Sequence, residues 1–291
     1  MKKLVYDTFR TFSEHGGTML GGAAAFFAVL SAAPLLLLTV AIAAPLAGSD
    51  QAREELLRAL SQFVGHDSAR TLAAILDNAR RSDRGTLATT LGTLVVLYGS
   101  TRLFTALQHA LNTMWDVRIR RVETFGHVAW WQVRKRLIAF CMVLLCGLVL
   151  LGSVLLRAGL SHARRIVPRD LSGAWWVLDH AVSVALVAGL FTLIFRLLPD
   201  VRIAWKDALA GAVVTATLFG FGRTVVGYYL GQKGVATTFG AAGGLVVLLL
   251  WAHYSAQIFF LGAAFTAEWA RSRGRPIEPT RHSIEVRVDH A

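Results

Sequence analysis

The residues best suited to chemistry are polar groups placed inside long apolar stretches. Tyr98, Arg102, Thr105, His109 and Asn112 follow one another at intervals of four, three, four and three residues, which places them on one face of a helix. An arginine inside an apolar helix is costly in a membrane and usually faces a bundle interior or a wet cavity. The stripe therefore predicts a face that attracts an anion. The alternative is that His109 and Asn112 lie at the membrane interface and only Arg102 is deep.

A second arginine, Arg223, lies in another apolar stretch. Its helical face is otherwise made of small residues, namely Ala216, Gly220, Gly227 and Gly231. Such a face is typical of close helix packing, which is the alternative to a binding role for Arg223.

The last apolar stretch places His253, Gln257 and Glu268 on one face. Glu268 lies near the inner end of the stretch, where an ordinary interfacial role competes with proton transfer. Because the arginines lie within apolar stretches and the acids near their ends, the interior has excess positive charge, which an anion or a lipid phosphate would neutralise. The alternative is that each arginine pairs with backbone carbonyls or with a distant acid. The predicted ligand-binding residues are Arg102, Arg223, Asn112, Gln257, His253, Glu268 and Tyr98.

Common enzyme motifs are absent from the sequence. There is no HExxH, Walker A or GxSxG motif and no Cys/His cluster with zinc spacing, so we predict no catalytic residue, no cofactor and no metal site. The basic segment Arg118–Arg136 contains Trp130 and Trp131, which resembles an RNA-binding patch. The alternative is that this segment lies on the inner side of a membrane, where basic residues and interfacial tryptophans are common. This alternative explains every residue of the segment, and we expect no nucleic-acid partner.

Composition identifies the elements that must position these groups. Of 291 residues, 55% are hydrophobic and 16% are charged, whereas soluble domains have about 45–50% apolar and about 25% charged residues. The apolar residues form uninterrupted runs, which predicts an integral membrane protein and excludes a disordered, collagen-like or disulfide-rich chain. We predict an all-α polytopic protein with six transmembrane helices, at about 22–47, 87–107, 137–156, 177–198, 208–230 and 242–265.

Lys and Arg are more frequent in the segments that face the cytoplasm when the N-terminus is inside, which predicts cytoplasmic termini in a bacterial inner membrane. Residues 48–86 repeat apolar positions at helical spacing and are predicted to form a periplasmic helical hairpin. We expect residues 1–270 to form one transmembrane domain and residues 271–291 to form a disordered cytoplasmic tail. Membrane lipids are the expected partners, and a homo-oligomer is compatible with this architecture.

Several motifs in order resemble those of the YihY/BrkB family of bacterial inner-membrane proteins. They are Ser31–Leu36, Leu97–Phe104, Ala110–Trp115, Leu197–Val201, Trp205–Ala212, Leu249–Trp251 and Tyr254–Gln257. The resemblance covers the chain to about Arg271. It implies six spans, cytoplasmic termini, a transporter-like protein and a link to serum resistance and the cell envelope. It implies no catalytic residues, and the family's former label, ribonuclease BN, is regarded as a misassignment.

The chain departs from this family at two positions. The usual aromatic pair after the tryptophan is His253-Tyr254, and the usual Gly-Ala-Glu is Gly262-Ala263-Ala264. Glu268, one turn later on the same face, is a candidate substitute for the missing acid.

The leading functional hypothesis is a transporter or lipid-handling protein in which Arg102 and Arg223 hold an anionic ligand and Asn112 and Gln257 orient it. The alternative is a cell-envelope scaffold that transports nothing and whose basic inner loops bind anionic lipid or a partner. A membrane-bound ribonuclease is disfavoured because the sequence has no acidic metal cluster.

Overall fold

A computed structural model describes residues 2–47, 50, 53–54, 57–58, 61, 69–74, 77, 102–119, 172–232, 243–275, 277–279 and 283–285. These residues are mostly helical. The long helices are α1 (Lys2–Glu14), α2 (Gly17–Ala47), α7 (Ser172–Leu197), α8 (Trp205–Gln232) and α10 (Gly243–Ser272), and residues 102–114 are also helical. The strands are β1 (Val117–Ile119), β2 (Val201–Arg202), β3 (Glu278–Pro279) and β4 (Ser283–Glu285).

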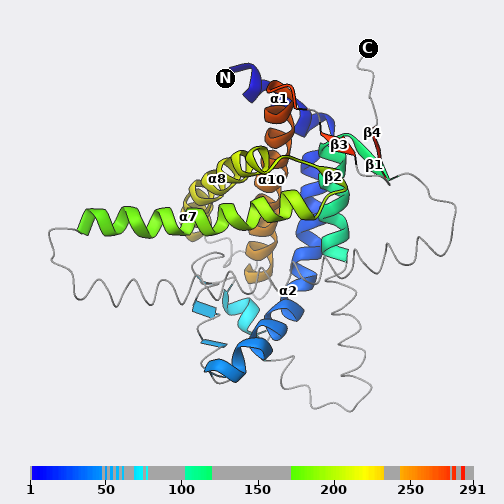
Figure 1. Cartoon of the computed structure of the whole chain (residues 1–291). Helices are drawn as coiled ribbons and strands as arrows, with labels where there is room; N and C mark the ends of the chain where they lie inside the picture. The colour runs from blue at the N-terminus through cyan, green and yellow to red at the C-terminus, as the bar shows by residue number, and fades with distance from the viewer. Residues whose placement is uncertain are drawn as a thin grey trace.

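Helix α10 is the element around which the described part of the chain is arranged. It contacts α1, α2 and α8, and α7 packs on α8. Figure 1 shows α10 upright, with α1 near its upper end and with α7 and α8 running across it. From Gly243 to Ala267 the helix has no charged residue, which suits a helix in apolar surroundings.

The predicted spans fall on long helices wherever the structure describes them. The spans predicted at 22–47, 177–198, 208–230 and 242–265 coincide with α2, α7, α8 and α10. Among the described residues, α10 is long and apolar enough to cross a membrane, and α1 with the first part of α2, bent by 63°, satisfies the same criterion together. The span predicted at 87–107 is described only from residue 102, and the one at 137–156 lies outside the described residues. The number of spans stays a prediction.

The segment predicted as a helical hairpin is helical at the positions that the structure describes between residues 50 and 77. An ion pair joins its two halves, because Arg53 donates to Asp77 over 2.9 Å and 2.6 Å. This contact supports a hairpin, while its periplasmic location stays a prediction.

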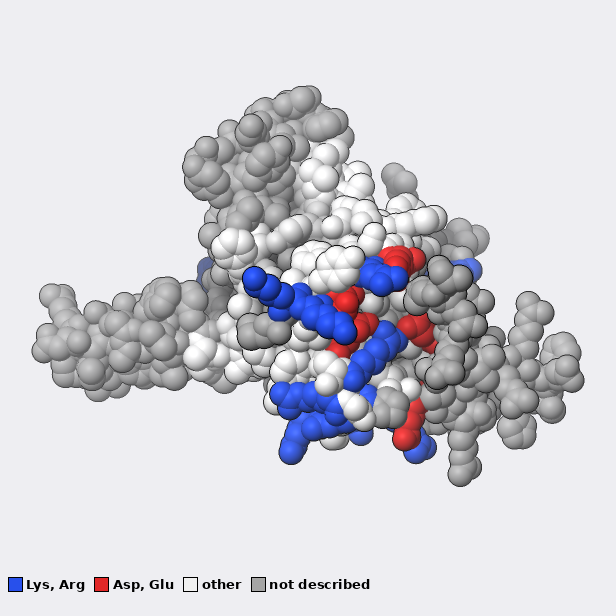
Figure 2. All heavy atoms as spheres, turned by 90° about the horizontal axis from the view of Figure 1, so that it is seen from above, with Lys and Arg blue, Asp and Glu red and all other residues white. Residues whose placement is uncertain are grey.

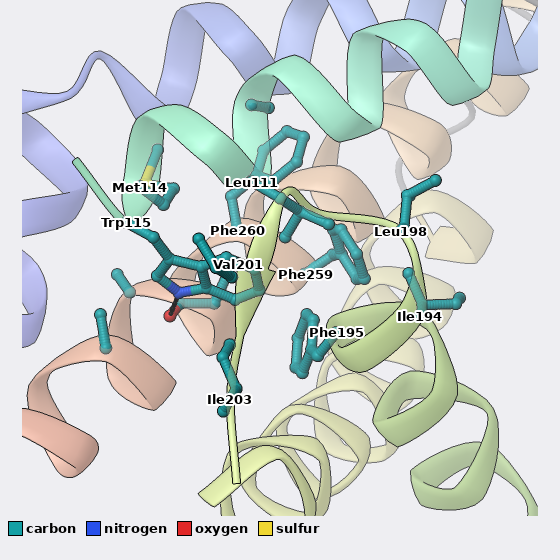
Figure 3. Packing of buried hydrophobic residues seen from close by; sticks show 14 of the residues in the cluster. Leu111, Met114, Trp115, Ile194, Phe195, Leu198, Val201, Ile203, Phe259 and Phe260 are labelled. Atoms are coloured by element: carbon teal, nitrogen blue, oxygen red, sulfur yellow. Dashed lines mark hydrogen bonds between the residues drawn. The ribbon is translucent and has the colours of Figure 1, made fainter. Parts of the chain in front are cut away.

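The hydrophobic core lies where residues 102–117, the end of α7, β2 and α10 meet (Figure 3). Trp115 is 1% exposed and its Nε1 donates to the carbonyl oxygen of Ala263 over 2.9 Å. The Trp115 ring meets Phe195 edge-on, with centroids 6.2 Å apart, and Phe195 in turn contacts Phe259. Large aromatic side chains contribute much of the buried area in such a core. Two of the motifs quoted above, at 110–115 and 197–201, therefore supply packing.

Two glycines with positive φ set the ends of the helices around this core. Gly16 has φ +65° and separates α1 from α2, and Gly274 has φ +66° directly after α10. Glycine adopts this conformation without the penalty that a side chain incurs. After Gly274 the amide of Arg275 donates to the carbonyl of Ala270 over 3.0 Å, which closes the helix end as in a Schellman motif.

Two described parts of the C-terminal segment pair with strands elsewhere in the chain, while the disorder predicted for residues 271–291 stays a prediction. β4 pairs antiparallel with β1, and β3 pairs antiparallel with β2. Arg275 also donates to both carboxylate oxygens of Asp207, at 3.1 Å and 3.3 Å, and the side chain of Asp207 is 2% exposed. Polar composition suggests disorder, but these backbone pairings and the buried Asp207 give the segment partners that composition does not reveal.

Candidate functional site

Two polar side chains predicted to share a face of the last span are hydrogen-bonded. Gln257 Nε2 and His253 Nε2 lie 2.5 Å apart, one turn apart on α10. An amide nitrogen donates, so it pairs with a ring nitrogen that has no proton, and the imidazole proton then lies on Nδ1. The pair faces two glycines of α2, because a Cβ placed at Gly21 would lie 3.1 Å from Gln257 Cγ and one at Gly22 would lie 3.9 Å from His253 Nδ1.

Tyr254 and Ser255 extend this polar segment around α10. The Tyr254 hydroxyl lies against Gly222 of α8, where an added Cβ would overlap the ring. Ser255 Oγ is buried and, in the part of the chain that the structure describes, accepts and donates no hydrogen bond. Buried hydroxyls normally have a partner. We call His253, Tyr254, Ser255 and Gln257 the polar band; it lies halfway along α10, between α2 and α8.

A close crossing of α8 and α10 positions the polar band. Thr215 of α8 lies against Gly262 of α10, and Thr266 of α10 lies against Gly211 of α8, so that any Cβ at either glycine would overlap the facing threonine. Each threonine hydroxyl donates to a carbonyl of its own helix four residues earlier, Thr215 to Gly211 over 2.7 Å and Thr266 to Gly262 over 2.8 Å. This reciprocal arrangement satisfies both hydroxyls and lets the two backbones approach closely.

The stripe predicted around Arg102 divides in the structure. Arg102, Thr105 and His109 are exposed, whereas Asn112 is 4% exposed. Asn112 Nδ2 donates to Asp200 Oδ2 over 2.9 Å, and Asn112 Oδ1 accepts from the Asp200 amide over 2.9 Å. Asn112 thus holds the turn between α7 and β2. It is hydrogen-bonded to Asp200, whereas Gln257 is hydrogen-bonded to His253.

Two further predicted residues cannot be placed beside a ligand. Arg223 belongs to α8, but its side chain lies outside the described part of the structure, as does all of Tyr98. Their roles stay predictions.

Glu268 belongs to a cluster of charged and polar groups where α1, residues 102–116 and α10 meet. Its Oε1 accepts from Thr11 Oγ1 over 2.9 Å and from Arg271 Nη1 over 2.6 Å. Arg271 Nη2 donates to Asp116 Oδ2 over 2.6 Å, and His15 Nε2 lies 2.7 Å from Asp116 Oδ1. We call Thr11, His15, Asp116, Glu268 and Arg271 the charged junction. Glu268 thus pairs with Arg271 and Thr11, while its role at an interface or in proton transfer stays a prediction.

The geometry of the charged junction favours a protonated His15. Its Nδ1 lies 2.7 Å from the carbonyl oxygen of Thr11, and its Nε2 faces the Asp116 carboxylate, so both ring nitrogens meet acceptors and both must donate. The hydrogen bond to Asp116 raises the pKa of His15 above its ordinary value. Burial alone raises the pKa of Asp116, but the hydrogen bonds from His15 and Arg271 reverse that effect, and its pKa lies below the usual value.

Sequence reasoning did not find His15, Asp116 or Asp200. His15 and Asp116 are 101 positions apart, and no local spacing reports such a contact. A signal for the α8–α10 crossing was present, because the pattern Gly-x-x-x-Thr occurs at Gly211–Thr215 and at Gly262–Thr266.

The described residues form a mostly helical protein with long helices and exposed apolar side chains, which is compatible with a membrane protein. The family described as Virulence factor BrkB matches residues 8–285, and the chain belongs to this family. No solved structure matches the chain.

Curated relatives are membrane proteins of similar sequence. A UPF0761 membrane protein of Ralstonia nicotianae is 27% identical over 92% of this chain and 58% of its own length. A second, of Nitrosospira multiformis, is 24% identical over 91% of this chain and 60% of its own length. A third, of Tolumonas auensis, is 25% identical over 88% of this chain and 82% of its own length. The chain thus spans about three fifths of the length of the first two.

Proposed function

We propose that this BrkB-family membrane protein is a multi-pass inner-membrane transporter or lipid-handling protein whose intramembrane site binds an anion or a phosphate group. The observation that carries the proposal is the polar band halfway along α10, which contains the hydrogen-bonded pair of His253 and Gln257 and the unpartnered hydroxyl of Ser255. Polar groups in the middle of a span are expensive and usually mark a binding site or a pathway.

The chemistry of the polar band favours an oxygen-rich ligand. The His253 Nδ1 proton and the hydroxyls of Tyr254 and Ser255 are donors, and α10 has no acid before Glu268. Donors without a nearby negative charge suit phosphate or carboxylate oxygens, which accept hydrogen bonds strongly. Arg102 and Arg223 remain in the proposal as the cations that attract such a group.

Transport is tested with the full chain in vesicles that contain a fluorescent phosphatidylglycerol, or with entrapped radioactive inorganic phosphate. We expect the wild type to move one of these probes faster than protein-free vesicles. His253→Ala and Gln257→Leu should each reduce that rate by about tenfold, as expected for loss of a hydrogen bond of about 1.4 kcal/mol. The measurement is the rate at which dithionite bleaches the lipid or at which phosphate escapes.

The matched control is Ser272→Ala, which removes an exposed hydroxyl from the end of the same helix and should leave the rate unchanged. Full activity of both polar-band variants would contradict the site. Failure of the wild type to move either probe would contradict transport and favour the alternative, a scaffold of the cell envelope. The exposed basic residues of α1, Lys2, Lys3 and Arg10, support that alternative.

The proposal includes six spans, a periplasmic hairpin and cytoplasmic termini. In a chain whose Cys141 and Cys146 are replaced, Asp50→Cys in intact cells should react with a maleimide that crosses the outer but not the inner membrane. Glu14→Cys, at an exposed position of α1, should react only after the inner membrane is permeabilised. The charge bias of the loops predicts this pattern, and the reverse pattern of labelling would invert the topology.

A further inference from the structure

Helix α1 exposes three large apolar side chains although it packs on α10 and α2. Val5, Tyr6 and Phe9 are 51%, 68% and 57% exposed. At 3.6 residues per turn they fall within an arc of about 100° on one side of the helix. Contiguous exposed apolar side chains mark a surface that contacts something other than water.

The remaining sides of α1 have different characters. Thr8 and Thr11 are buried, and α1 packs on α10. Lys3, Arg10 and Glu14 are exposed and lie on the opposite side of the apolar arc from the buried threonines. The helix therefore has one face toward the protein, an apolar flank and a charged flank, which is the pattern of a helix that lies in a membrane interface.

The contacts of α1 with α10 place it at the level of an aromatic belt. Thr11 donates to Glu268, and the next residue, Trp269, stacks on Phe265 and lies under the guanidinium of Arg273, 4.2 Å from the ring centroid. Tryptophan with adjacent basic residues is typical of the boundary between hydrocarbon and headgroups. α1 also turns by 63° away from the first part of α2, so it does not continue the direction of that helix.

We infer that α1 is an interfacial helix that binds the anionic lipid surface of the leaflet in which α10 ends. Val5, Tyr6 and Phe9 enter the outer acyl region. The ammonium groups of Lys2 and Lys3 contact lipid phosphates, together with the guanidinium of Arg10, which is exposed while its Nε donates to Glu14 over 2.7 Å. Charge complementarity selects this occupant: Figure 2, which looks onto the end of the molecule where α1 lies, shows Lys and Arg side chains over that face, with Asp and Glu side chains among them. Basic residues close to a membrane are attracted to anionic lipids by about 1 kcal/mol each.

The test uses the full chain, with Cys141 and Cys146 replaced, in vesicles of phosphatidylcholine and phosphatidylglycerol. A nitrobenzoxadiazole label at Phe9→Cys on the apolar flank is compared with one at Glu14→Cys on the charged flank. We expect a lipid with a doxyl group near the top of its acyl chain to quench the label at position 9 about threefold more than the label at position 14. Aqueous iodide should show the opposite order.

Two results would overturn the inference. Equal quenching of both labels by iodide would mean that the apolar flank faces water. Shielding of position 9 from both iodide and doxyl lipid would mean that a protein, such as a second copy of the chain, covers it.

The anionic preference has its own comparison. Quenching of position 9 by doxyl lipid should be weaker in vesicles of phosphatidylcholine alone, and Lys2→Gln, Lys3→Gln and Arg10→Gln together should remove that difference. Equal quenching in both lipid mixtures with the three basic residues intact would overturn the assignment to anionic lipid.

Discussion

Replacing Gly262 by alanine is expected to destabilise the protein by about 1–3 kcal/mol, the usual cost of forcing extra atoms into a packed contact. A Cβ at this position would overlap Thr215 Oγ1 and would lie 2.9 Å from Thr215 Cβ and 3.0 Å from Thr215 Cγ2. Thr215 Cβ is bonded directly to the backbone of α8, so rotation of the side chain does not relieve its overlap with the new methyl group. The α8–α10 crossing must open, and the midpoint of thermal unfolding in detergent should fall.

A glycine exchange tests whether the loss comes from this contact. Thr215→Gly alone leaves a void and adds a helical glycine, which costs about 1 kcal/mol. Combined with Gly262→Ala, it removes the side chain that the new methyl group would meet. We expect the double variant to be more stable than the sum of the two single effects predicts, by more than about 1 kcal/mol.

The matched control is Gly189→Ala on α7, where an added Cβ has no neighbour within 4 Å among the described residues. In that open position alanine should be neutral or should stabilise the helix by up to about 1 kcal/mol. Strictly additive effects of Gly262→Ala and Thr215→Gly would show that the two residues do not share the contact described here.

The sequence alone predicts those elements whose structure depends on a single local pattern. Long apolar runs predict α2, α7, α8 and α10, because a helix is the structure that satisfies backbone hydrogen bonds in lipid. The spacing of His253 and Gln257 predicts a shared face, and their hydrogen bond confirms it. Their function stays a prediction.

The rest depends on contacts between distant positions. Asn112 has the spacing of a site residue, but the turn that follows α7 covers it and occupies both ends of its amide through Asp200. The C-terminal strands β3 and β4 pair with β2 and β1, which lie far away in the sequence. The composition of the C-terminal segment alone therefore does not predict this pairing. Tertiary partners of this kind override what a local pattern favours.

Replacing Asp116 by asparagine is expected to destabilise the protein by about 2 kcal/mol, below the 3–5 kcal/mol of a fully buried pair because the junction is partly exposed. The side chains of Asp116 and His15 are 20% and 14% exposed. Asparagine tolerates the positive φ of 57° at this position about as well as aspartate does, so the change removes charge and keeps the backbone. His15 and Arg271 then lose their shared acceptor.

The effect of Asp116→Asn should depend on pH in one direction. Because the pKa of His15 is raised in the folded protein, its contribution is complete below the ordinary value near 6.5 and is lost as pH rises through the raised value. Asp116, whose pKa is lowered, is ionised throughout this range and would lose its contribution only at acidic pH. The stability difference between wild type and Asp116→Asn should therefore be largest near pH 6 and shrink toward pH 9. A residual difference should remain, because Arg271 keeps its charge.

Thermal unfolding of the detergent-solubilised full chain between pH 6 and pH 9 measures this dependence. His15→Gln should flatten the pH dependence while it preserves the 2.6 Å bond between Arg271 and Asp116. Asp7→Asn on α1 removes a carboxylate outside the junction and should reproduce the wild-type curve. A stability difference between wild type and Asp116→Asn that stays constant across this range would contradict a protonated His15, and the bond from Arg271 alone would then account for the role of Asp116.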